Sequence, residues 1–376
     1  MHTSLFTPLK IGSVLLSHRV VMSPLTRMRA STPGNVPTEL NAQYYGQRAS
    51  EGGLIVTEAT QVRADGQGSP ATPGIHSADQ VDGWRKVVSA AHAAGAKVFA
   101  QLWHVGRISH TSHQPDGGVP LAPSPVAANG MALTASWTRE PYPVPRAVDL
   151  SEISGLVQSY VHAAENALAA GFDGIEVSAA NGYLLEQFMQ SRTNHRSDQY
   201  GGSVVNRCRF AIEVIEAVSS VANGRPVGIR LSPFGVANDS CEDDPMPVYA
   251  CLLENATKLD VDYIHVVEPR ASGIAARGDV PRPGQPYASA LLRPWWPGIL
   301  IANGGFDGPS AAAAIEEGSA DAVSFGRMFI SNPDLPRRIR LGATLTPYDR
   351  TTFYGGDARG YTDYPVFSEL PAGQLK

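Results

Sequence analysis

Short apolar segments that alternate with helix-forming stretches are the feature that most limits how this chain can fold. Eight such segments occur, and several, such as Ile299–Ala302, are almost continuously apolar, as parallel strands buried on both faces are. The predicted strands span 19–24, 54–60, 97–104, 174–177, 227–231, 263–267, 299–302 and 322–325. The predicted helices span 77–94, 152–170, 207–221, 248–259 and 309–318, with a last one starting near Pro333. This alternation predicts a (β/α)8 barrel.

Two further segments complete the predicted architecture. Residues 5–16 hold two apolar runs around a glycine and predict an N-terminal β-hairpin that plugs one end of the core. Residues 105–149, after the third strand, are rich in Pro and Gly without helical or strand periodicity, and we interpret them as a lid or subdomain insertion. We therefore expect residues 1–376 to form one barrel domain. A doubly wound open sheet is the alternative, but no G-x-G-x-x-G follows the first strand.

Composition narrows the class of protein. The net charge of −5 gives no basic patch for nucleic acid, and no apolar run approaches the ~20 residues that span a bilayer. Cys208, Cys241 and Cys251 lack metal-site spacing and fit a reducing compartment. No signal peptide is recognised at the N-terminus. We therefore expect a cytoplasmic protein that binds neither nucleic acid nor membrane.

Polar residues follow the ends of several predicted strands. In a β/α barrel the chemistry collects at the C-terminal strand ends, so Thr26, Gln101, Arg230 and the group Ser178–Tyr183 predict a pocket there. A plain Asn-Gly turn would explain Asn181 alone. Gln101 and Arg230 suit a planar heterocycle with carbonyls and ring nitrogens. Tyr183 suits a general acid.

The last two strands end in glycines. Gly304 and Gly305 follow the seventh strand, and Gly326 with Arg327 follows the eighth. These two loops are the usual phosphate site of such barrels, because glycine lets backbone N–H groups approach an anion. Ordinary turn glycines with a surface arginine remain the alternative for either loop alone.

Two other chemistries have weaker support. A Schiff-base enzyme needs a lysine at a strand end, and Lys10, Lys86, Lys97 and Lys258 all lie elsewhere. A metal-dependent hydrolase would need clustered ligands, but no H-x-H or H-E-x-x-H pattern is present. We therefore expect no metal site.

Six ordered motifs resemble the old yellow enzyme family of FMN-dependent ene-reductases, over about Leu5 to Pro365. They are R-V-V-M-S-P-L-T-R-M-R-A, Q-L-W-H-V-G-R, N-G-Y-L-L-E-Q-F, H-R-S-D-Q-Y-G-G-S-V-V-N-R, F-G-R-M-F-I-S-N-P-D-L and G-Y-T-D-Y-P. The resemblance implies that Tyr183 is the proton donor and that Asn181 is one of two residues holding the substrate oxygen. It implies FMN contacts from Pro24, Leu25, Thr26, Ala59, Gln101, Arg230, Gly304, Gly305, Gly326 and Arg327. Trp103 and Tyr354 would line the substrate pocket.

The implied chemistry is ping-pong. NADPH or NADH reduces the flavin and leaves; an activated alkene then takes hydride from flavin N5 and a proton from Tyr183. The implied substrates are small alkenes, nitro compounds or nitrate esters, and the implied state is a monomer or homodimer.

Two positions depart from the family pattern. Ser178 stands where the family usually has His, and Ser69 stands where relatives often have Tyr at the pocket mouth. Losing a donor to a developing oxyanion costs on the order of 2.7–4 kcal/mol. The changes would suit an enlarged pocket, which we favour, an engineered Ser178, or an FMN-binding NAD(P)H oxidase or nitro reductase with poor alkene reduction.

Overall fold

A closed barrel of eight parallel strands forms the centre of the molecule in the computed structural model, which describes residues 2–269 and 287–368. The barrel strands are β3 (Val20–Met22), β4 (Leu54–Val56), β6 (Lys97–Trp103), β11 (Gly174–Ala179), β12 (Val227–Leu231), β13 (Tyr263–Val267), β14 (Ile299–Asn303) and β15 (Ala322–Phe325). Each strand pairs with the next in the chain, β15 pairs with β3, and β6 pairs with β11, which closes the ring. The predicted barrel is thus confirmed, and β5 (Thr60–Gln61) adds beside β6.

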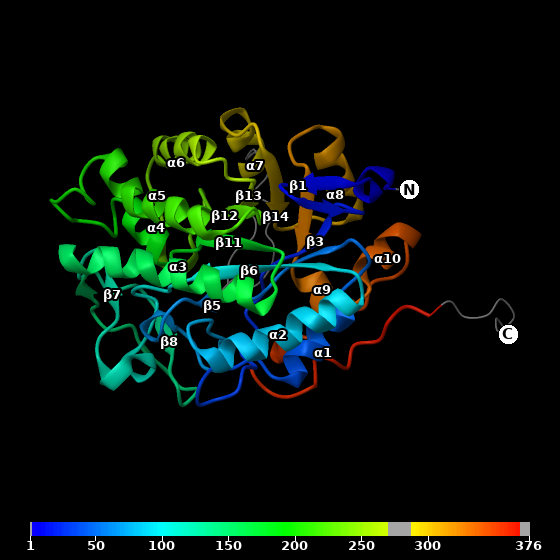
Figure 1. Cartoon of the computed structure of the whole chain (residues 1–376), viewed down its shortest axis with the longest axis horizontal. Helices are drawn as coiled ribbons and strands as arrows, with labels where there is room; N and C mark the ends of the chain where they lie inside the picture. Colours follow the sequence, from blue (N-terminus) through cyan, green and yellow to red (C-terminus); the bar gives the residue numbers. More distant parts are fainter. Residues whose placement is uncertain (1, 270–286, 369–376) are drawn as a thin grey trace, which may run out of the picture.

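Helices surround this ring, as Figure 1 shows. They are α1 (Glu39–Arg48), α2 (Ala78–Ala93), α3 (Ile153–Ala170), α4 (Leu184–Met189), α5 (Val204–Val221), α6 (Met246–Lys258), α7 (Ala288–Leu292), α8 (Gly308–Glu316), α9 (Arg327–Ser331) and α10 (Leu335–Leu341). Local sequence sets their ends. Ser77 accepts a hydrogen bond from the Gln80 N–H at the start of α2, and Gly171 ends α3 with a left-handed φ of 95°.

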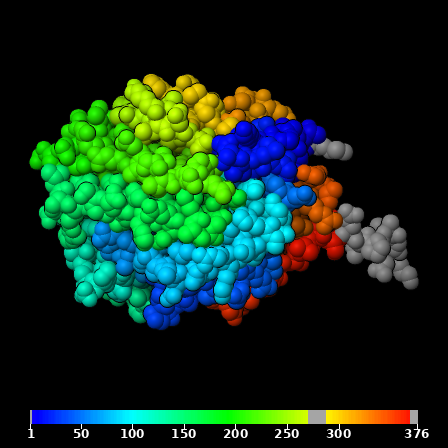
Figure 2. Space-filling model, in the orientation of Figure 1, coloured from blue at the N-terminus to red at the C-terminus, as the bar shows by residue number. Residues whose placement is uncertain are grey.

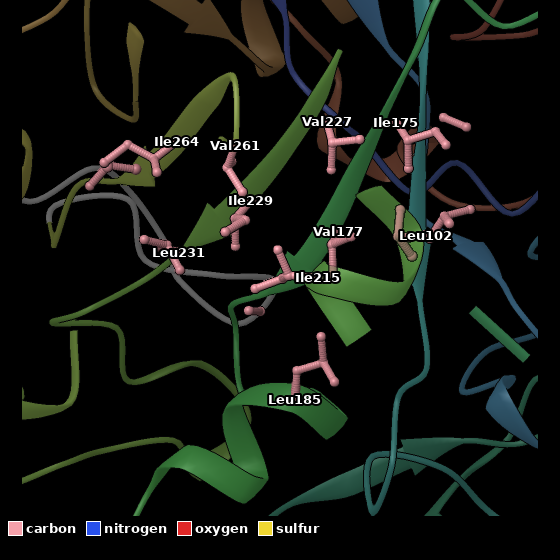
Figure 3. Packing of buried hydrophobic residues seen from close by; sticks show 14 of the residues in the cluster. Leu102, Ile175, Val177, Leu185, Ile215, Val227, Ile229, Leu231, Val261 and Ile264 are labelled. Carbon is pink, nitrogen blue, oxygen red and sulfur yellow. The ribbon is translucent and has the colours of Figure 1, made fainter. Parts of the chain in front are cut away.

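Alternation along each strand sorts its residues between the barrel interior and the helical shell. The shell side of β11 and β12 carries Ile175, Val177, Val227 and Ile229, which Figure 3 shows in one cluster with Ile215 of α5 and Leu185 of α4. All six side chains are almost completely buried. Burying apolar area of this kind provides most of the stabilisation that holds helices on the barrel.

The lower interior of the barrel is apolar and is filled from outside by the N-terminal hairpin. Antiparallel β1 (Leu9–Ile11) and β2 (Val14–Leu16) place four apolar side chains in one cluster with interior residues such as Val21, Phe99 and Tyr263. A Cβ on Gly228 would lie 2.1 Å from the Tyr263 ring, so β12 needs glycine at that position. The hairpin therefore covers the end of the barrel opposite the strand C-termini.

The upper interior of the barrel is polar. At the inward positions nearer the strand C-termini stand Ser23, Gln101, Glu176, Ser178, Arg230, His265, Asn303 and Ser324, all at most 9% exposed. Their strand register puts Ser178 beside Arg230, and Arg230 beside His265. This polar layer forms the floor of the site described below.

The insertion 105–149 lies at the lower left of Figure 1 and of Figure 2, where it is teal. It contains an antiparallel pair, β8 (Met131–Leu133) with β9 (Arg139–Pro141), and a parallel pair, β7 (Leu121–Ala122) with β10 (Arg146–Ala147). Its residues Val105, Ile108 and Ala128 pack with Trp103 and Tyr183. The insertion thus covers one side of the barrel mouth.

The structure corrects several predicted boundaries. The strand predicted over 54–60 ends at Val56, because the Glu58 carboxylate turns away to accept a hydrogen bond from the Arg27 N–H. Helix α5 begins at Val204 rather than Arg207, since Ser203 caps it by accepting from the Asn206 N–H. Helices α1, α4 and α9 were not predicted. The apolar positions of α1 are alanines and tyrosines among polar residues, and α4 and α9 are each shorter than seven residues, too short for periodicity to be visible.

Candidate active site

One cavity of about 460 Å³ opens at the C-terminal ends of the barrel strands. Nearly every site residue predicted from the sequence lines it: Pro24, Leu25, Thr26, Ala59, Gln101, Trp103, Ser178, Asn181, Tyr183, Arg230, Gly304, Gly305, Gly326, Arg327 and Tyr354. Ser69 does not line the cavity. It is half-buried in its loop, and its carbonyl accepts hydrogen bonds from Gln67 and Thr72.

A buried carboxylate, Glu176, orients the polar floor of the cavity. It accepts hydrogen bonds from the Gln101 amide at 2.6 Å and the Tyr263 hydroxyl at 3.0 Å, and it lies 2.8 Å from Nδ1 of His265. Burial alone would raise its pKa, but His265 and Arg230 outweigh burial and hold the pKa of Glu176 below its ordinary value. Glu176 is therefore an anion at neutral pH, and it fixes which way the Gln101 amide faces.

Arg230 lies fully buried next to this carboxylate. Its guanidinium donates to Oδ1 of Asn303 at 2.8 Å and contacts the His265 ring at 2.7 Å. Burial, and then the charge of Arg230, lower the pKa of His265 to about 4. His265 is therefore neutral at neutral pH, and Arg230 and Glu176 balance each other in charge.

Hydrogen bonds among small polar side chains continue the floor toward β15 and β3. The Asn303 amide donates to Ser23, Ser23 donates to Ser324, and Ser324 lies 2.6 Å from Nε2 of His265. These contacts satisfy the buried polar groups, which would otherwise cost several kcal/mol in total. The floor is therefore rigid before any ligand binds.

Glycines form the end of the cavity next to β14 and β15. Gly304 and Gly305 have φ of 115° and 65°, values that favour glycine. A Cβ on Gly326 would lie 3.1 Å from Leu25, and helix α9 starts at the next residue, Arg327. Backbone N–H groups and a guanidinium thus meet at one end of the cavity, which is a suitable arrangement for a phosphate.

The turn Asn181–Tyr183 forms the opposite wall. Asn181 has a left-handed φ of 58°, and its N–H donates to Ser232 at 2.7 Å. Ser232 in turn donates to the buried carboxylate of Glu186, which also accepts from the Gly182 N–H. Burial raises the pKa of Glu186. The backbone of the turn is therefore held from below, while the Asn181 side chain borders the cavity.

Tyr183 stands at the start of α4 with its hydroxyl in the cavity wall. Its ring packs edge-on against Trp103, with centroids 4.6 Å apart. Burial raises its pKa well above the ordinary value, although a hydrogen bond from Asn238 acts in the opposite direction. The hydroxyl is therefore protonated at neutral pH and can give that proton to a bound molecule.

The C-terminal segment brings Tyr354 to the cavity mouth. Buried Arg27 and Arg29 hold this segment by donating to the carbonyl oxygens of Phe353 and Thr352, at 2.9 Å in each case. The ring of Trp137, from the insertion, lies where a Cβ on Gly355 would be. Two segments far apart in sequence thus meet beside the mouth.

Several residues of this site were not singled out from the sequence. Glu176, His265, Asn303 and Ser324 belong to the floor, and Asn238 belongs to the wall. The floor residues could have been found, because they recur at every second position with Ser178 and Arg230 in otherwise apolar strands. Asn238 lies in an irregular loop, where no periodic signal exists.

No membrane-spanning candidate is found among the described helices, since none combines sufficient length with sufficient apolar character. Within residues 2–269 and 287–368, no group of three or more His, Cys, Asp or Glu is arranged to hold a metal ion.

The fold and the cavity define a (β/α)8-barrel enzyme whose site accepts a phosphate-bearing ligand at one end and offers a proton donor at the other. Residues 4–345 match the NADH:flavin oxidoreductase / NADH oxidase family, and the chain belongs to that family. It is therefore an FMN-dependent oxidoreductase of the old yellow enzyme type.

Individual relatives cover almost the whole chain. The chain is 44% identical to 12-oxophytodienoate reductase 1 of Oryza sativa subsp. japonica over 368 residues, which is 97% of this chain and 94% of that protein. A morphinone reductase in complex with tetrahydroNAD superposes with a TM-score of 0.88 at 44% identity, covering 97% of this chain and 98% of that one. The old yellow enzyme homologue from Zymomonas mobilis gives 0.90 at 41% identity, covering 96% and 99%.

Proposed function

We propose that this enzyme uses NADPH or NADH to reduce the activated C=C bond of α,β-unsaturated carbonyl or nitro compounds. The observation that carries the proposal is the buried, protonated Tyr183 hydroxyl, which borders the same cavity as Arg230 and the glycine cradle. The relatives named as 12-oxophytodienoate reductase and morphinone reductase support reduction of a conjugated ketone.

The donor set of the cavity fits FMN. Gly304, Gly305, Gly326 and Arg327 would hold the phosphate, because their N–H groups and guanidinium meet at one end. Arg230 and the Glu176-oriented amide of Gln101 would hold the polar edge of the flavin ring. Pro24, Leu25, Thr26 and Ala59 would border the ring itself. Bound FMN supplies a carrier that takes hydride from the nicotinamide and passes it to the alkene in two half-reactions.

The residues of this chain supply the proton and the orientation. Asn181 would hold the carbonyl or nitro oxygen, which withdraws electrons from the β-carbon as hydride arrives there. Tyr183 gives its hydroxyl proton to the α-carbon, so the C=C bond becomes a single bond and the phenolate later regains a proton from water. Trp103 and Tyr354 would line the pocket around the substrate.

Ser178 sets the expected substrate range. It borders the cavity three residues before Asn181 and is shorter than the histidine usual in the family. We infer that the space favours bulkier substrates, with Asn181 as the main polarising amide. Nitro compounds or nitrate esters with weak alkene reduction form the alternative, because they depend less on a second donor.

Isotope labelling tests this function. Turnover of 2-cyclohexenone with NADPH in D2O should place deuterium at the α-carbon, and 4-deuterated NADPH in H2O should place it at the β-carbon. In Tyr183→Phe we expect alkene reduction to slow by ~10²–10⁴-fold while reduction by NADPH is unchanged. Absence of a saturated product from any enone tested, with nitro compounds consumed instead, would support the alternative.

A further inference from the structure

We propose that Asn238, in the loop after β12, positions the proton of Tyr183: its side-chain amide donates a hydrogen bond to the hydroxyl oxygen, so the O–H proton points into the cavity. This inference rests on the proposed role of Tyr183 as proton donor. Asn238 borders the same cavity and contacts Tyr183 from the side of β12. It acts through Tyr183 and is therefore a positioning residue.

The contacts of Asn238 fix its orientation. One amide hydrogen is used by the Asn181 carbonyl, since Nδ2 lies 2.8 Å from that oxygen. The second hydrogen is available for the Tyr183 oxygen, to which Asn238 is also hydrogen-bonded. Since this bond lowers the pKa of Tyr183, Asn238 favours the phenolate and is the donor in the pair.

Close packing keeps the Asn238 loop against the turn that carries Tyr183. A Cβ on Gly182 would lie 2.8 Å from the Ala237 carbonyl and 3.1 Å from Cβ of Asn238, so only glycine fits between them. Asn238 itself has a left-handed φ of 56°, a conformation that asparagine tolerates better than most residues. The amide is thus held at short range from Tyr183.

Both flanks of Asn238 are anchored. Arg107, which begins the lid, donates to the Asp239 carbonyl at 3.1 Å, and the Asn129 N–H donates to the Asp239 carboxylate at 3.3 Å. Ser240 accepts from Gln190 at 2.7 Å and contacts Glu186, the carboxylate under the Asn181–Tyr183 turn. The lid, the loop and the turn therefore form one connected unit.

The chemical consequence follows from the two roles of a hydroxyl. When its oxygen accepts a hydrogen bond from Asn238, the O–H remains free to donate, and the only open direction is the cavity. When the proton moves to the α-carbon of the alkene, the O–H bond breaks and the new negative charge on oxygen is met by the same amide. Asn238 thus assists both before and after proton transfer.

The test uses Asn238→Ala and Asn238→Asp, with Val236→Ala as the matched control. Val236 lies in the same loop with its side chain 56% exposed. Reoxidation of the reduced holoenzyme is followed with 2-cyclohexenone and with ferricyanide, which takes electrons without a proton from Tyr183. We expect Asn238→Ala to slow the enone reaction ~10-fold, as loss of about one hydrogen bond predicts, with ferricyanide unchanged. Asn238→Asp should recover as pH falls and its carboxyl becomes a donor.

A double-mutant cycle and a titration decide the outcome. In a Tyr183→Phe background, Asn238→Ala should have no further effect. With a fluorinated tyrosine at position 183, whose hydroxyl titrates in an accessible range, Asn238→Ala should raise the hydroxyl pKa by about one unit, ~10-fold in the proton equilibrium. An unchanged pKa, or an equal slowing in the Phe background, would overturn the proposal. Because the titration needs no substrate, a wild type inactive on alkenes would reject the proposed function alone.

Discussion

Single side chains decide the electrostatics of this cavity, and Glu176 has the largest role. It is fully buried, accepts from Gln101 and Tyr263, and balances the charge of Arg230. Replacing Glu176 by Gln keeps the shape but leaves Arg230 as an uncompensated buried cation. We expect a loss of roughly 3–5 kcal/mol in the free energy of unfolding, together with weaker FMN binding.

Urea unfolding and FMN titration measure these two effects. Glu254→Gln is the matched control, because Glu254 pairs with Lys258 at the surface with its side chain 69% exposed. Equal stability of the Glu176 and Glu254 variants would show that the buried charge is not needed.

Ser178 is the residue that separates this cavity from the usual family pattern. Ser178→His restores a second donor beside Asn181 and fills space. We expect phenols and small enones to bind up to ~10-fold more tightly, the size of one added hydrogen bond, and bulky enones to bind more weakly. Phenol binding is read from the long-wavelength absorbance of the oxidised holoenzyme. Unchanged affinity and rate for all these ligands would contradict the enlarged-pocket interpretation.

At the scale of elements, the N-terminal hairpin closes the lower barrel without touching the cavity. Ile11 is completely buried among interior residues, whereas Leu15, on the same hairpin, is 64% exposed. Ile11→Ala should lower the free energy of unfolding by about 2–5 kcal/mol, because it leaves a hole in the plug. Leu15→Ala should change it little.

The two hairpin variants also separate stability from catalysis. Both half-reactions of Ile11→Ala, measured below its unfolding temperature, should match those of the wild type. A selective loss of activity in that variant would show that the hairpin influences the site.

Elements differed in how well they could be predicted from the sequence. The strands Val227–Leu231, Tyr263–Val267 and Ala322–Phe325 agree with their predicted bounds, because parallel strands buried on both faces leave an apolar signal. Helix α1 was missed, since its buried face consists of Asn41, Ala42, Tyr44 and Tyr45 rather than aliphatic residues. The contribution of Asn238 arises only when its loop packs on Gly182, so it depends on tertiary contacts that no local pattern contains.

At the scale of the whole molecule, buried histidines make stability depend on pH. Burial lowers the pKa of His265 and of His18 from 6.5 to about 4, so the folded protein resists protonation that the unfolded chain accepts. Stability should therefore fall as pH decreases from about 6.5 to 4, with a slope approaching ~1.4 kcal/mol per pH unit for each histidine.

Urea unfolding at pH 7, 6 and 5 checks this dependence. His265→Gln should reduce the slope by about one proton, and so should His18→Gln, which lies far from the cavity floor. Only the His265 variant should also alter FMN affinity. A slope that is identical in all three proteins would contradict the assignment of both rings as neutral.

The anaerobic colour cycle of the purified protein tests the central claim most directly. The protein should be yellow, should bleach when NADPH or NADH is added, and should regain its flavin absorbance rapidly with 2-cyclohexenone. Bleaching without return would reject alkene reduction of this kind while leaving the FMN barrel in place. A protein that stayed colourless after incubation with FMN would contradict the account as a whole.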